Sequence, residues 1–308
     1  MHAPESISSA IITGGTGPIG FKLVQRLVSH GCKVLLITSP TSARHQIFAG
    51  YDKVEIVPAG LEGLRNLDLG QPWDVFFHLG WIASENRARR DDPKLQADNI
   101  GYALDAVACA ARSGCKVFVG AGSQAEYGRL ETPARPDSPT NPTEAYGIAK
   151  LAAGRLSAVL CRQLGMRHCW ARIHSVFGEH DRQTTLIMYV IGCLLRGESP
   201  RLTACEQQWD YLYSGECAEA LWRLALTGAD GMAYPLGSGE KRSLKEYLQE
   251  VRSALGVETP LDFGALPYPP GQVMHMQADI AQLAEDTGWK PKNDFSANIR
   301  HVAEAQRG

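Results

Sequence analysis

Short apolar runs alternate with amphipathic stretches through the first half of the chain. The apolar runs have the length of buried β-strands and occupy residues 9–13, 33–37, 54–57, 75–79, 117–119 and 168–172. Helical spacing of apolar residues appears between several of them, at residues 21–28, 95–113 and 143–164. Strands that alternate with helices in this way predict an α/β fold with a doubly wound parallel sheet.

The pattern changes after residue 175. Residues 186–195 form an apolar helical stretch, and a second helix is predicted at residues 218–226. The tetrapeptide from Ser243 to Glu246 has the spacing of a capping box, which opens an amphipathic helix that continues to Leu255. These elements predict a smaller α/β part at the C-terminal end.

Composition narrows the class of protein. The 308 residues allow one large domain or two unequal ones, and a net charge of -2 gives no reason to expect a nucleic-acid partner. No apolar run reaches the roughly 18 residues of a membrane span. The eight cysteines include no Cys-x-x-Cys pair, so we expect no metal site and a reducing environment. The first residues lack a secretory pattern, and we expect a cytoplasmic protein.

Three glycines mark the junction between the first strand and the first helix. Gly14, Gly17 and Gly20 follow the apolar run, and Pro18 and Ile19 lie between them at the start of the helix. A turn without side chains lets a pyrophosphate approach the backbone, while the helix start offers free N–H groups. In this strand–turn–helix position the glycines predict dinucleotide binding rather than only a tight turn.

A second constellation carries candidate chemistry. Tyr146 and Lys150 lie four residues apart on a predicted helix and therefore share one face. A neighbouring ammonium group favours the phenolate, so Tyr146 could exchange a proton with a substrate oxygen. Ser123 and His78 fall at the carboxyl ends of their predicted strands, at the edge where such sheets bind ligands. His78 alone is more typical of a structural residue.

Eight short motifs, which include these residues, follow one another in one order along nearly the whole chain. They lie at residues 13–20, 78–80, 122–128, 146–150, 172–178, 209–213, 236–239 and 287–291, with Asn99 between the second and the third. In this order they resemble the extended short-chain dehydrogenases/reductases of the NAD-dependent epimerase/dehydratase family, which act mainly on nucleotide sugars. The resemblance implies a Rossmann-type sheet with a smaller substrate-binding part.

The resemblance also implies roles for individual residues. Ser123, Tyr146 and Lys150 would be catalytic, with Tyr146 moving the proton, Ser123 binding the sugar oxygen, and Lys150 lowering the tyrosine pKa and holding the nicotinamide ribose. The implied cofactor contacts are Gly14, Gly17, Pro18, Ile19, Gly20, Ser39, Arg44, Leu61, Leu79, Gly80, Asn99, Tyr146, Lys150 and Ile173. The implied substrate contacts are Trp81, Gln124, His174, Ser175, Leu186 and Trp209. Asn99 would fix helix geometry or a water near Lys150, or be only a solvated helix residue.

The end of the second strand bears on the cofactor. NAD-preferring relatives place an acidic residue there, for the ribose 2′-hydroxyl. Residues 38–44 contain no acid, whereas Ser39 and Arg44 could receive a 2′-phosphate. A surface turn with an incidental arginine is the alternative. The sequence therefore favours NADP(H), with NAD(H) possible.

The loop after Ser123 bears on the reaction. Dehydratases of the family follow this serine with Asp-Glu, and here Gln124 and Ala125 take those positions, while Glu126 comes one residue late and would point elsewhere. Water elimination is disfavoured. The remaining reactions are 4-keto reduction of a nucleotide-linked 4-keto-6-deoxyhexose, which the sequence favours, and epimerisation at C4 as the alternative. A dehydratase fits less well because Gln124 and Ala125 replace Asp-Glu. A sensor that binds NADP(H) without chemistry fits less well because the Tyr-x-x-x-Lys pair is kept.

Substrate contacts show further departures from the family. Trp81 replaces a small residue and could line the cleft or pack in the core, and His174-Ser175 replaces Phe-Asn. Trp209 stands where an arginine normally helps to bind the nucleotide; Arg182, Arg201 and Arg242 are candidate substitutes. The resemblance divides the chain into a cofactor-binding domain, residues 1–174 and about 209–234, and a nucleotide-sugar part, residues about 175–208 and 235–308. It also implies a homodimer.

Overall fold

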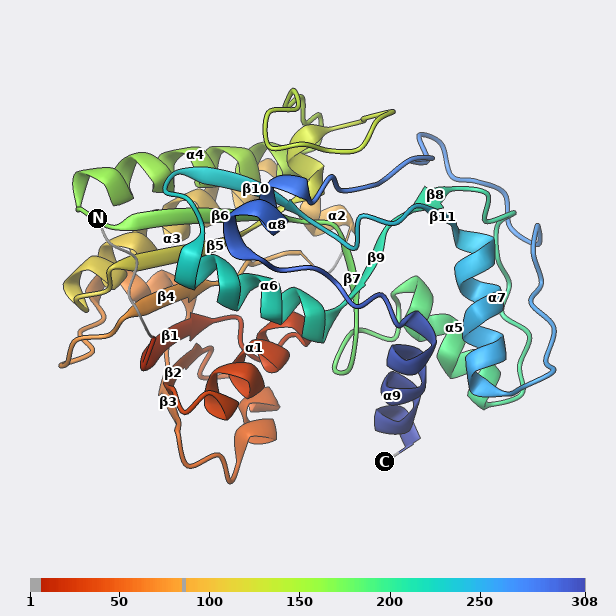
Figure 1. The fold of residues 1–308 in the computed structure, drawn as a ribbon, viewed down its shortest axis with the longest axis horizontal. Helices are drawn as coiled ribbons and strands as arrows, with labels where there is room; N and C mark the ends of the chain where they lie inside the picture. The colour runs from red at the N-terminus through yellow and green to blue at the C-terminus, as the bar shows by residue number, and fades with distance from the viewer. Residues whose placement is uncertain (1–6, 85–86, 308) are drawn as a thin grey trace.

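A parallel sheet of seven strands forms the centre of the computed structural model, which describes residues 7–84 and 87–307 (Figure 1). The strand order is β10-β6-β5-β4-β1-β2-β3. The strands are β1 (Ser9–Thr13), β2 (Lys33–Thr38), β3 (Val54–Pro58), β4 (Val75–His78), β5 (Val117–Ser123), β6 (Arg167–Ile173) and β10 (Met232–Leu236). All neighbouring pairs run parallel. The predicted α/β fold with a doubly wound parallel sheet is confirmed.

Helices cover both faces of this sheet. α1 (Pro18–Ser29) packs beside α6 (Ser214–Thr227), and α3 (Pro93–Arg112) packs beside α4 (Ala145–Gln163). Ile11 and Ile12 are adjacent in β1 but belong to different apolar cores, one under each layer of helices. Successive side chains of a strand point to opposite faces, which is why strands buried on both sides are continuous apolar runs.

A third apolar core lies at one end of the molecule, where Figure 1 shows α5, α7 and α9 apart from the sheet. These helices are α5 (Leu186–Leu195), α7 (Leu244–Leu255) and α9 (Phe295–Arg307). The predicted capping box is present: the Ser243 hydroxyl accepts a hydrogen bond from the Glu246 N–H, and the Glu246 carboxylate accepts one from the Ser243 N–H. The predicted division of the chain into two domains stays a proposal.

Short elements complete the fold. They are α2 (Arg87–Arg90), α8 (Ala281–Thr287), the 3-10 helices η1 (Ala43–Phe48), η2 (Leu61–Asn66) and η3 (Gln124–Tyr127), the pair β7 (Ser175–Phe177) and β9 (Tyr211–Tyr213), and the pair β8 (Gln208–Trp209) and β11 (Arg242–Ser243). None of the helices in the described ranges has the length and apolar composition needed to cross a bilayer.

The chain reverses its direction across the sheet between β1 and β4, which are neighbours in the strand order. In open parallel sheets this reversal leaves a crevice at the carboxyl ends of the strands, and ligands bind there. Thr13, His78 and Ser123 are the last residues of β1, β4 and β5, so the fold brings their neighbourhoods to the same edge.

Candidate active site

The glycine turn between β1 and α1 is shaped for a phosphate group. A Cβ atom at Gly14, whose φ is +73°, would lie 2.7 Å from the backbone nitrogen of Gly80, and one at Gly20 would lie 2.3 Å from the Gly14 oxygen. At Gly17 a Cβ would meet only the Gly14 oxygen, at 3.6 Å. The turn is therefore closed toward the protein and open on the side of Gly17, where a side chain would fill the space.

The first turn of α1 supplies donors for that space. Gly17 is the N-cap residue of α1 and has no side chain that could accept a hydrogen bond from the first N–H groups of the helix. It therefore does not cap the N–H groups of Ile19 and Gly20, and Pro18 carries no N–H. Free N–H groups at a helix start attract anions. The residues present therefore fit the pyrophosphate of a dinucleotide cofactor.

Neighbouring cofactor candidates lie against this turn. Gly80 approaches Leu61 so closely that a Cβ at Gly80 would be 3.0 Å from Leu61 Cδ2, and Leu79 lies beside Gly14. Ile173 ends β6 as the pairing partner of Ser123. At the end of β2, the Ser39 hydroxyl is 2.9 Å from the Thr41 hydroxyl.

Arg44 takes a position that the sequence did not predict. Its Nη2 donates a hydrogen bond to the His180 carbonyl oxygen at 2.8 Å, across 136 residues of sequence. The guanidinium therefore ties η1 to the loop after β7 through this hydrogen bond.

Ser123 is held at the end of β5 by a capping box. Its N–H donates to Glu126 Oε1 at 2.8 Å, and its hydroxyl oxygen accepts from the Ala125 N–H at 3.2 Å. The spacing Ser123-x-x-Glu126 is the sequence signature of this motif, so the sequence alone carried the signal for this cap.

Glu126 points into the protein core, as expected from its position one residue late in the motif. It is fully buried, accepts a hydrogen bond from Trp170 Nε1 at 2.9 Å and forms an ion pair with Arg172 at 2.8 Å. A buried carboxylate with its lone pairs occupied in this way is a structural anchor, because it orients Ser123 and is withdrawn from the cleft.

Trp170 also sets the distance between α4 and the sheet. Cβ atoms added at Gly120, Gly122 or Gly154 would lie 2.2, 2.2 and 2.7 Å from atoms of its indole ring. Two of these glycines are in β5 and the third is in α4, so the ring occupies the space that three missing side chains leave. This contact fixes the helix that carries Tyr146.

Tyr146 lies in the first turn of α4, beside Ser123. Burial raises the pKa of its phenol, while the charge of Arg90, a hydrogen bond with the Ser123 hydroxyl and the charge of Arg182 oppose that effect; Glu126 adds to it. The Arg90 guanidinium carbon lies 4.2 Å from the centroid of the phenol ring. The structure thus brings together Ser123 and Tyr146, and it adds Arg90, which the sequence did not single out.

Lys150 is buried one turn later in α4. Its ammonium donates a hydrogen bond to the Ala121 carbonyl oxygen at 2.6 Å and lies 3.7 Å from the centroid of the Trp81 indole ring. Burial lowers the pKa of Lys150 to about 7, Glu126 acts in the opposite direction, and Arg90 lowers the value further.

The loop that carries Trp81 is fixed by two buried amides of α3. Trp81 Nε1 donates to Gln96 Oε1 at 2.9 Å. Asn99 exchanges two hydrogen bonds with the backbone of Ile82, both at 2.9 Å. The amide of Asn99 is therefore engaged with this loop, and we assign it to loop geometry instead of a contact with the cofactor.

His78 is a structural residue in this arrangement. Its Nδ1 lies 2.9 Å from the Thr13 hydroxyl, and burial followed by the nearby charge of Lys150 lowers its pKa to about 3. The ring is therefore neutral near pH 7.

The candidate substrate residues fall into two groups. Gln124 and His174 line a small cavity of about 20 Å³ together with Met276 and Gln277. The Ser175 hydroxyl oxygen accepts a hydrogen bond from Trp209 Nε1 at 2.7 Å. Leu186, by contrast, packs against the apolar core formed by α5, α7 and α9.

Of the three arginines that were candidate substitutes at position 209, Arg182 lines the same cavity as Arg90. That cavity has a volume of about 410 Å³ and is also lined by Arg90, Thr184 and Thr185. Arg201 donates to the Ala265 carbonyl oxygen, and Arg242 forms an ion pair with Glu250.

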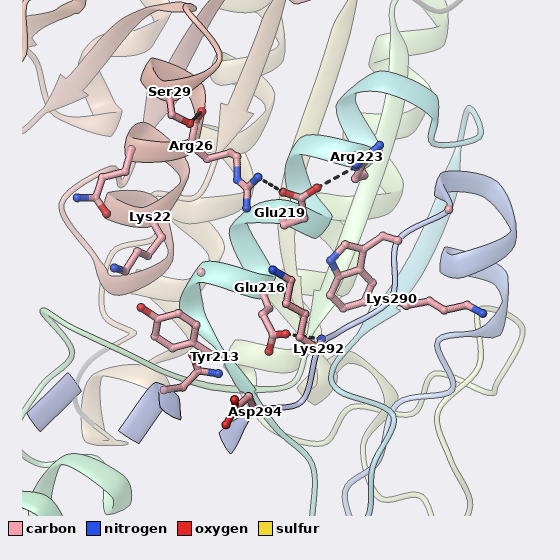
Figure 2. Close-up of a pocket in the computed structure, with 15 residues that line it drawn as sticks. Lys22, Arg26, Ser29, Tyr213, Glu216, Glu219, Arg223, Lys290, Lys292 and Asp294 are labelled. Carbon is pink, nitrogen blue, oxygen red and sulfur yellow. Dashed lines mark hydrogen bonds and ion pairs between the residues drawn. The ribbon is translucent and has the colours of Figure 1, made fainter. Parts of the chain in front are cut away.

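Another cavity lies away from this edge. Figure 2 shows it between α1, α6 and residues 288–298, with a volume of about 700 Å³. Glu219 binds both Arg26 and Arg223 across its floor. None of the residues that line it belongs to the predicted site.

A parallel sheet with a phosphate-shaped glycine turn and a Tyr–Lys pair at the carboxyl edge defines a dinucleotide-binding oxidoreductase-type fold. Residues 10–237 match the NAD dependent epimerase/dehydratase family. The chain belongs to this family, and it is an NAD(P)-dependent enzyme of the extended short-chain dehydrogenase/reductase type.

Relatives share the family at low identity. A dTDP-glucose 4,6-dehydratase of Mycolicibacterium smegmatis is 23% identical over 94% of this chain and 90% of its own length. A UDP-glucose 4-epimerase of the same organism is 24% identical over 96% and 97%. A dTDP-6-deoxy-L-talose 4-dehydrogenase (NAD(+)) of Aggregatibacter actinomycetemcomitans is 29% identical over 55% and 62%.

Solved structures share the fold. A UDP-N-acetylglucosamine 4-epimerase from Methanobrevibacter ruminantium, in complex with UDP-N-acetylmuramic acid, superposes with a TM-score of 0.88, at 22% identity over 98% of this chain and 99% of that one. A UDP-glucuronic acid 4-epimerase mutant from Bacillus cereus, in complex with a fluorinated UDP-sugar and NAD, gives 0.85 at 19% identity over 97% and 99%.

Proposed function

We propose that the protein exchanges hydride and proton at C4 of a nucleotide-linked sugar and epimerises that carbon. The observation that carries this proposal is the convergence of Ser123, Tyr146 and Lys150 at the carboxyl edge, beside the glycine turn, with no carboxylate at positions 124 and 125. Glu126 cannot replace that carboxylate pair, because Arg172 and Trp170 already engage it.

The chain's own residues handle the proton in this reaction. Tyr146 takes the proton of the C4 hydroxyl as the C4–H bond breaks, and Ser123 donates a hydrogen bond to the sugar oxygen. A nicotinamide cofactor held at the glycine turn and beside Tyr146 and Lys150 would supply the hydride chemistry in both directions, so no external oxidant would be consumed. When the hydride returns to the other face of C4, Tyr146 gives the proton back and the epimer is complete.

Relatives that extend over nearly the whole chain favour epimerisation. They include UDP-glucose 4-epimerases from two bacteria, at 24% and 25% identity. They also support a UDP-linked sugar as the substrate class, although dTDP-linked sugars occur among the relatives as well.

The second candidate is the 4-keto reduction that the sequence favours. The relative from Aggregatibacter, which is a 4-dehydrogenase of a dTDP-6-deoxysugar, supports it, as does the absence of an acid after β2. Both candidates use Tyr146 in the same way. They differ in whether the reduced cofactor is consumed.

The cofactor we propose is NAD(H), with NADP(H) as the competitor. The solved structures from Bacillus cereus contain NAD. Arg44, the candidate for a 2′-phosphate, already donates a hydrogen bond to the His180 carbonyl oxygen. Ser39 and Thr41 remain as hydroxyl contacts that either ribose could use.

We also propose a homodimer through α3 and α4. Ile148, Leu156 and Val159 lie on the outer face of α4 and are 50%, 46% and 47% exposed, which is unusual for large apolar side chains on one helix. A second copy of this face would cover them. A light-scattering mass equal to one chain would remove this proposal.

One experiment separates the candidates. The purified protein is incubated with UDP-glucose, UDP-N-acetylglucosamine, UDP-glucuronate or a dTDP-4-keto-6-deoxyhexose, and the C4 configuration of the product is read by NMR. Epimerisation predicts a C4 epimer with catalytic NAD and no net change in NADH absorbance. Stoichiometric oxidation of NADH or NADPH by the keto sugar alone would instead establish the reductase.

A further inference from the structure

Arg90 lies on the face of the Tyr146 ring. It is the last residue of α2, and its guanidinium carbon is 4.2 Å from the ring centroid. A guanidinium at this distance from an aromatic face makes a cation–π contact. Arg90 also lines a cavity of about 410 Å³, together with Asp91, Glu144 and Arg182.

Lys150 is turned toward other partners. Its ammonium donates to the Ala121 carbonyl oxygen at 2.6 Å and rests on the Trp81 indole at 3.7 Å, whereas its distance to the Tyr146 ring centroid is 5.8 Å. Burial also lowers the pKa of Lys150 to about 7, so near neutrality a large share of the molecules carries no charge there. A guanidinium stays protonated throughout this range.

We propose that Arg90 is a positioning residue that supplies a permanent positive charge to Tyr146 and supports ionisation of its phenol. The inference extends the proposed function, because it concerns the residue that moves the proton there. The Lys150 ammonium lies closer to the Trp81 ring, at 3.7 Å, than to the Tyr146 ring, at 5.8 Å, whereas the Arg90 guanidinium lies against the Tyr146 ring at 4.2 Å.

The other groups that face Tyr146 do not supply this charge equally. Glu126 opposes ionisation, and its own charge is matched by Arg172 at 2.8 Å. Arg182, on the loop after β7, also lowers the pKa of Tyr146, but less than Arg90 does. Its side chain is exposed, and solvent screens its charge. Ser123 contributes a hydrogen bond and no charge.

The charge of Arg90 determines the direction in which the pKa of Tyr146 shifts. Removing a positive charge beside a phenol disfavours the phenolate and raises the pKa of Tyr146. In the direction that oxidises the sugar, Tyr146 must be ionised, so kcat/KM rises with pH until ionisation is complete. Arg90→Gln should move this rising limb to higher pH by about one unit, the low end for a charge within contact distance.

Three variants test the proposal through the pH profile of kcat/KM. Arg90→Gln should lose about tenfold at pH values below the limb and approach the parent rate above it. Arg90→Lys should restore most of the profile. Arg89→Gln removes the same charge from the neighbouring, exposed position of α2 and should leave the profile in place. A uniform loss at all pH values in Arg90→Gln would show a merely structural role and overturn the proposal.

A second readout needs no turnover and so remains valid if the proposed reaction is wrong. Tyr146 is replaced by 3-fluorotyrosine, which ionises at lower pH than tyrosine, and its single fluorine signal is titrated by NMR. The midpoint should rise in the Arg90→Gln background, return in Arg90→Lys and stay unchanged in Arg89→Gln. An equal midpoint in all four proteins would overturn the proposal, whatever the enzyme's substrate is.

Discussion

The ammonium of Lys150 lies 3.7 Å from the centroid of the Trp81 indole ring, in a site where Lys150 is buried and Trp81 is half-buried. An ammonium group loses most of its hydration when it is buried, and a cation–π contact returns only part of it. Keeping this charge therefore costs the folded protein free energy, and burial accordingly lowers the pKa of Lys150 to about 7.

Replacing Lys150 by methionine should raise stability and abolish turnover. Because the folded-state pKa is depressed from 10.5 to about 7, the unfolded chain binds more protons between these values. The lysine thus destabilises the fold at pH 7 by on the order of a few kcal/mol, and Lys150→Met removes that cost. Urea unfolding at pH 7 measures the gain.

The pH dependence provides the control for that variant. As pH rises from 7 toward 10.5, the unfolded lysine loses its proton and the parent protein regains stability. The advantage of Lys150→Met should therefore shrink with pH. An advantage that stays constant from pH 7 to 9.5 would show that packing, and not charge burial, explains it.

The glycine turn allows a matched pair of substitutions. Gly17→Ala places a methyl group 3.6 Å from its nearest neighbour, so we expect stability within about 0.5 kcal/mol of the parent and NAD(H) affinity at least tenfold weaker. Gly20→Ala places it 2.3 Å from the Gly14 oxygen and should destabilise the fold as well. Calorimetric titration with NADH and thermal unfolding measure the two effects. Unchanged affinity in Gly17→Ala would place the pyrophosphate elsewhere.

The packing of α4 on Trp170 predicts another pair. Gly154→Ala brings a methyl group within 2.7 Å of the indole and should destabilise the protein by about 1–3 kcal/mol. In a Trp170→Phe background the cost should be smaller, because the crowded part of the ring is gone. Gly101→Ala on α3 meets nothing within 4 Å and should be neutral or stabilising by up to about 1 kcal/mol. Additive losses in the double variant would refute the contact.

Glu126 and Arg172 should behave as a buried pair. Glu126→Gln leaves the Arg172 guanidinium without its counter-charge and should cost about 3–5 kcal/mol. Loss of the carboxylate also weakens the cap on the Ser123 N–H, so turnover should fall. Chemical unfolding measures the loss of stability, and a turnover assay on the same preparation measures the loss of activity. A loss under 1 kcal/mol would mean that the pair is not buried in solution.

Much of this site could be predicted because its geometry is local. The strand–turn–helix around Gly14, Gly17 and Gly20 and the i,i+4 spacing of Tyr146 and Lys150 depend on neighbours in sequence. The fold class followed for the same reason, from runs of strand and helix length.

The features of the site that the sequence did not predict depend on contacts between residues distant in sequence. Arg90 belongs to a basic run that is typical of a solvated surface, and its place over Tyr146 depends on the path of the loop after β4, which Gln96 and Asn99 hold. The bond between Arg44 and the His180 carbonyl joins segments 136 residues apart. No periodicity in one sequence encodes such pairs.

The most direct test of the account is the turnover of Tyr146→Phe with whichever nucleotide sugar the parent converts. The phenyl ring preserves packing, and the loss of the hydroxyl removes the group that takes the C4 proton. We predict that turnover falls by about 10²–10⁴ fold while NADH affinity and the unfolding midpoint stay near those of the parent. Turnover within twofold of the parent would contradict the central claim that Tyr146 moves the proton at C4.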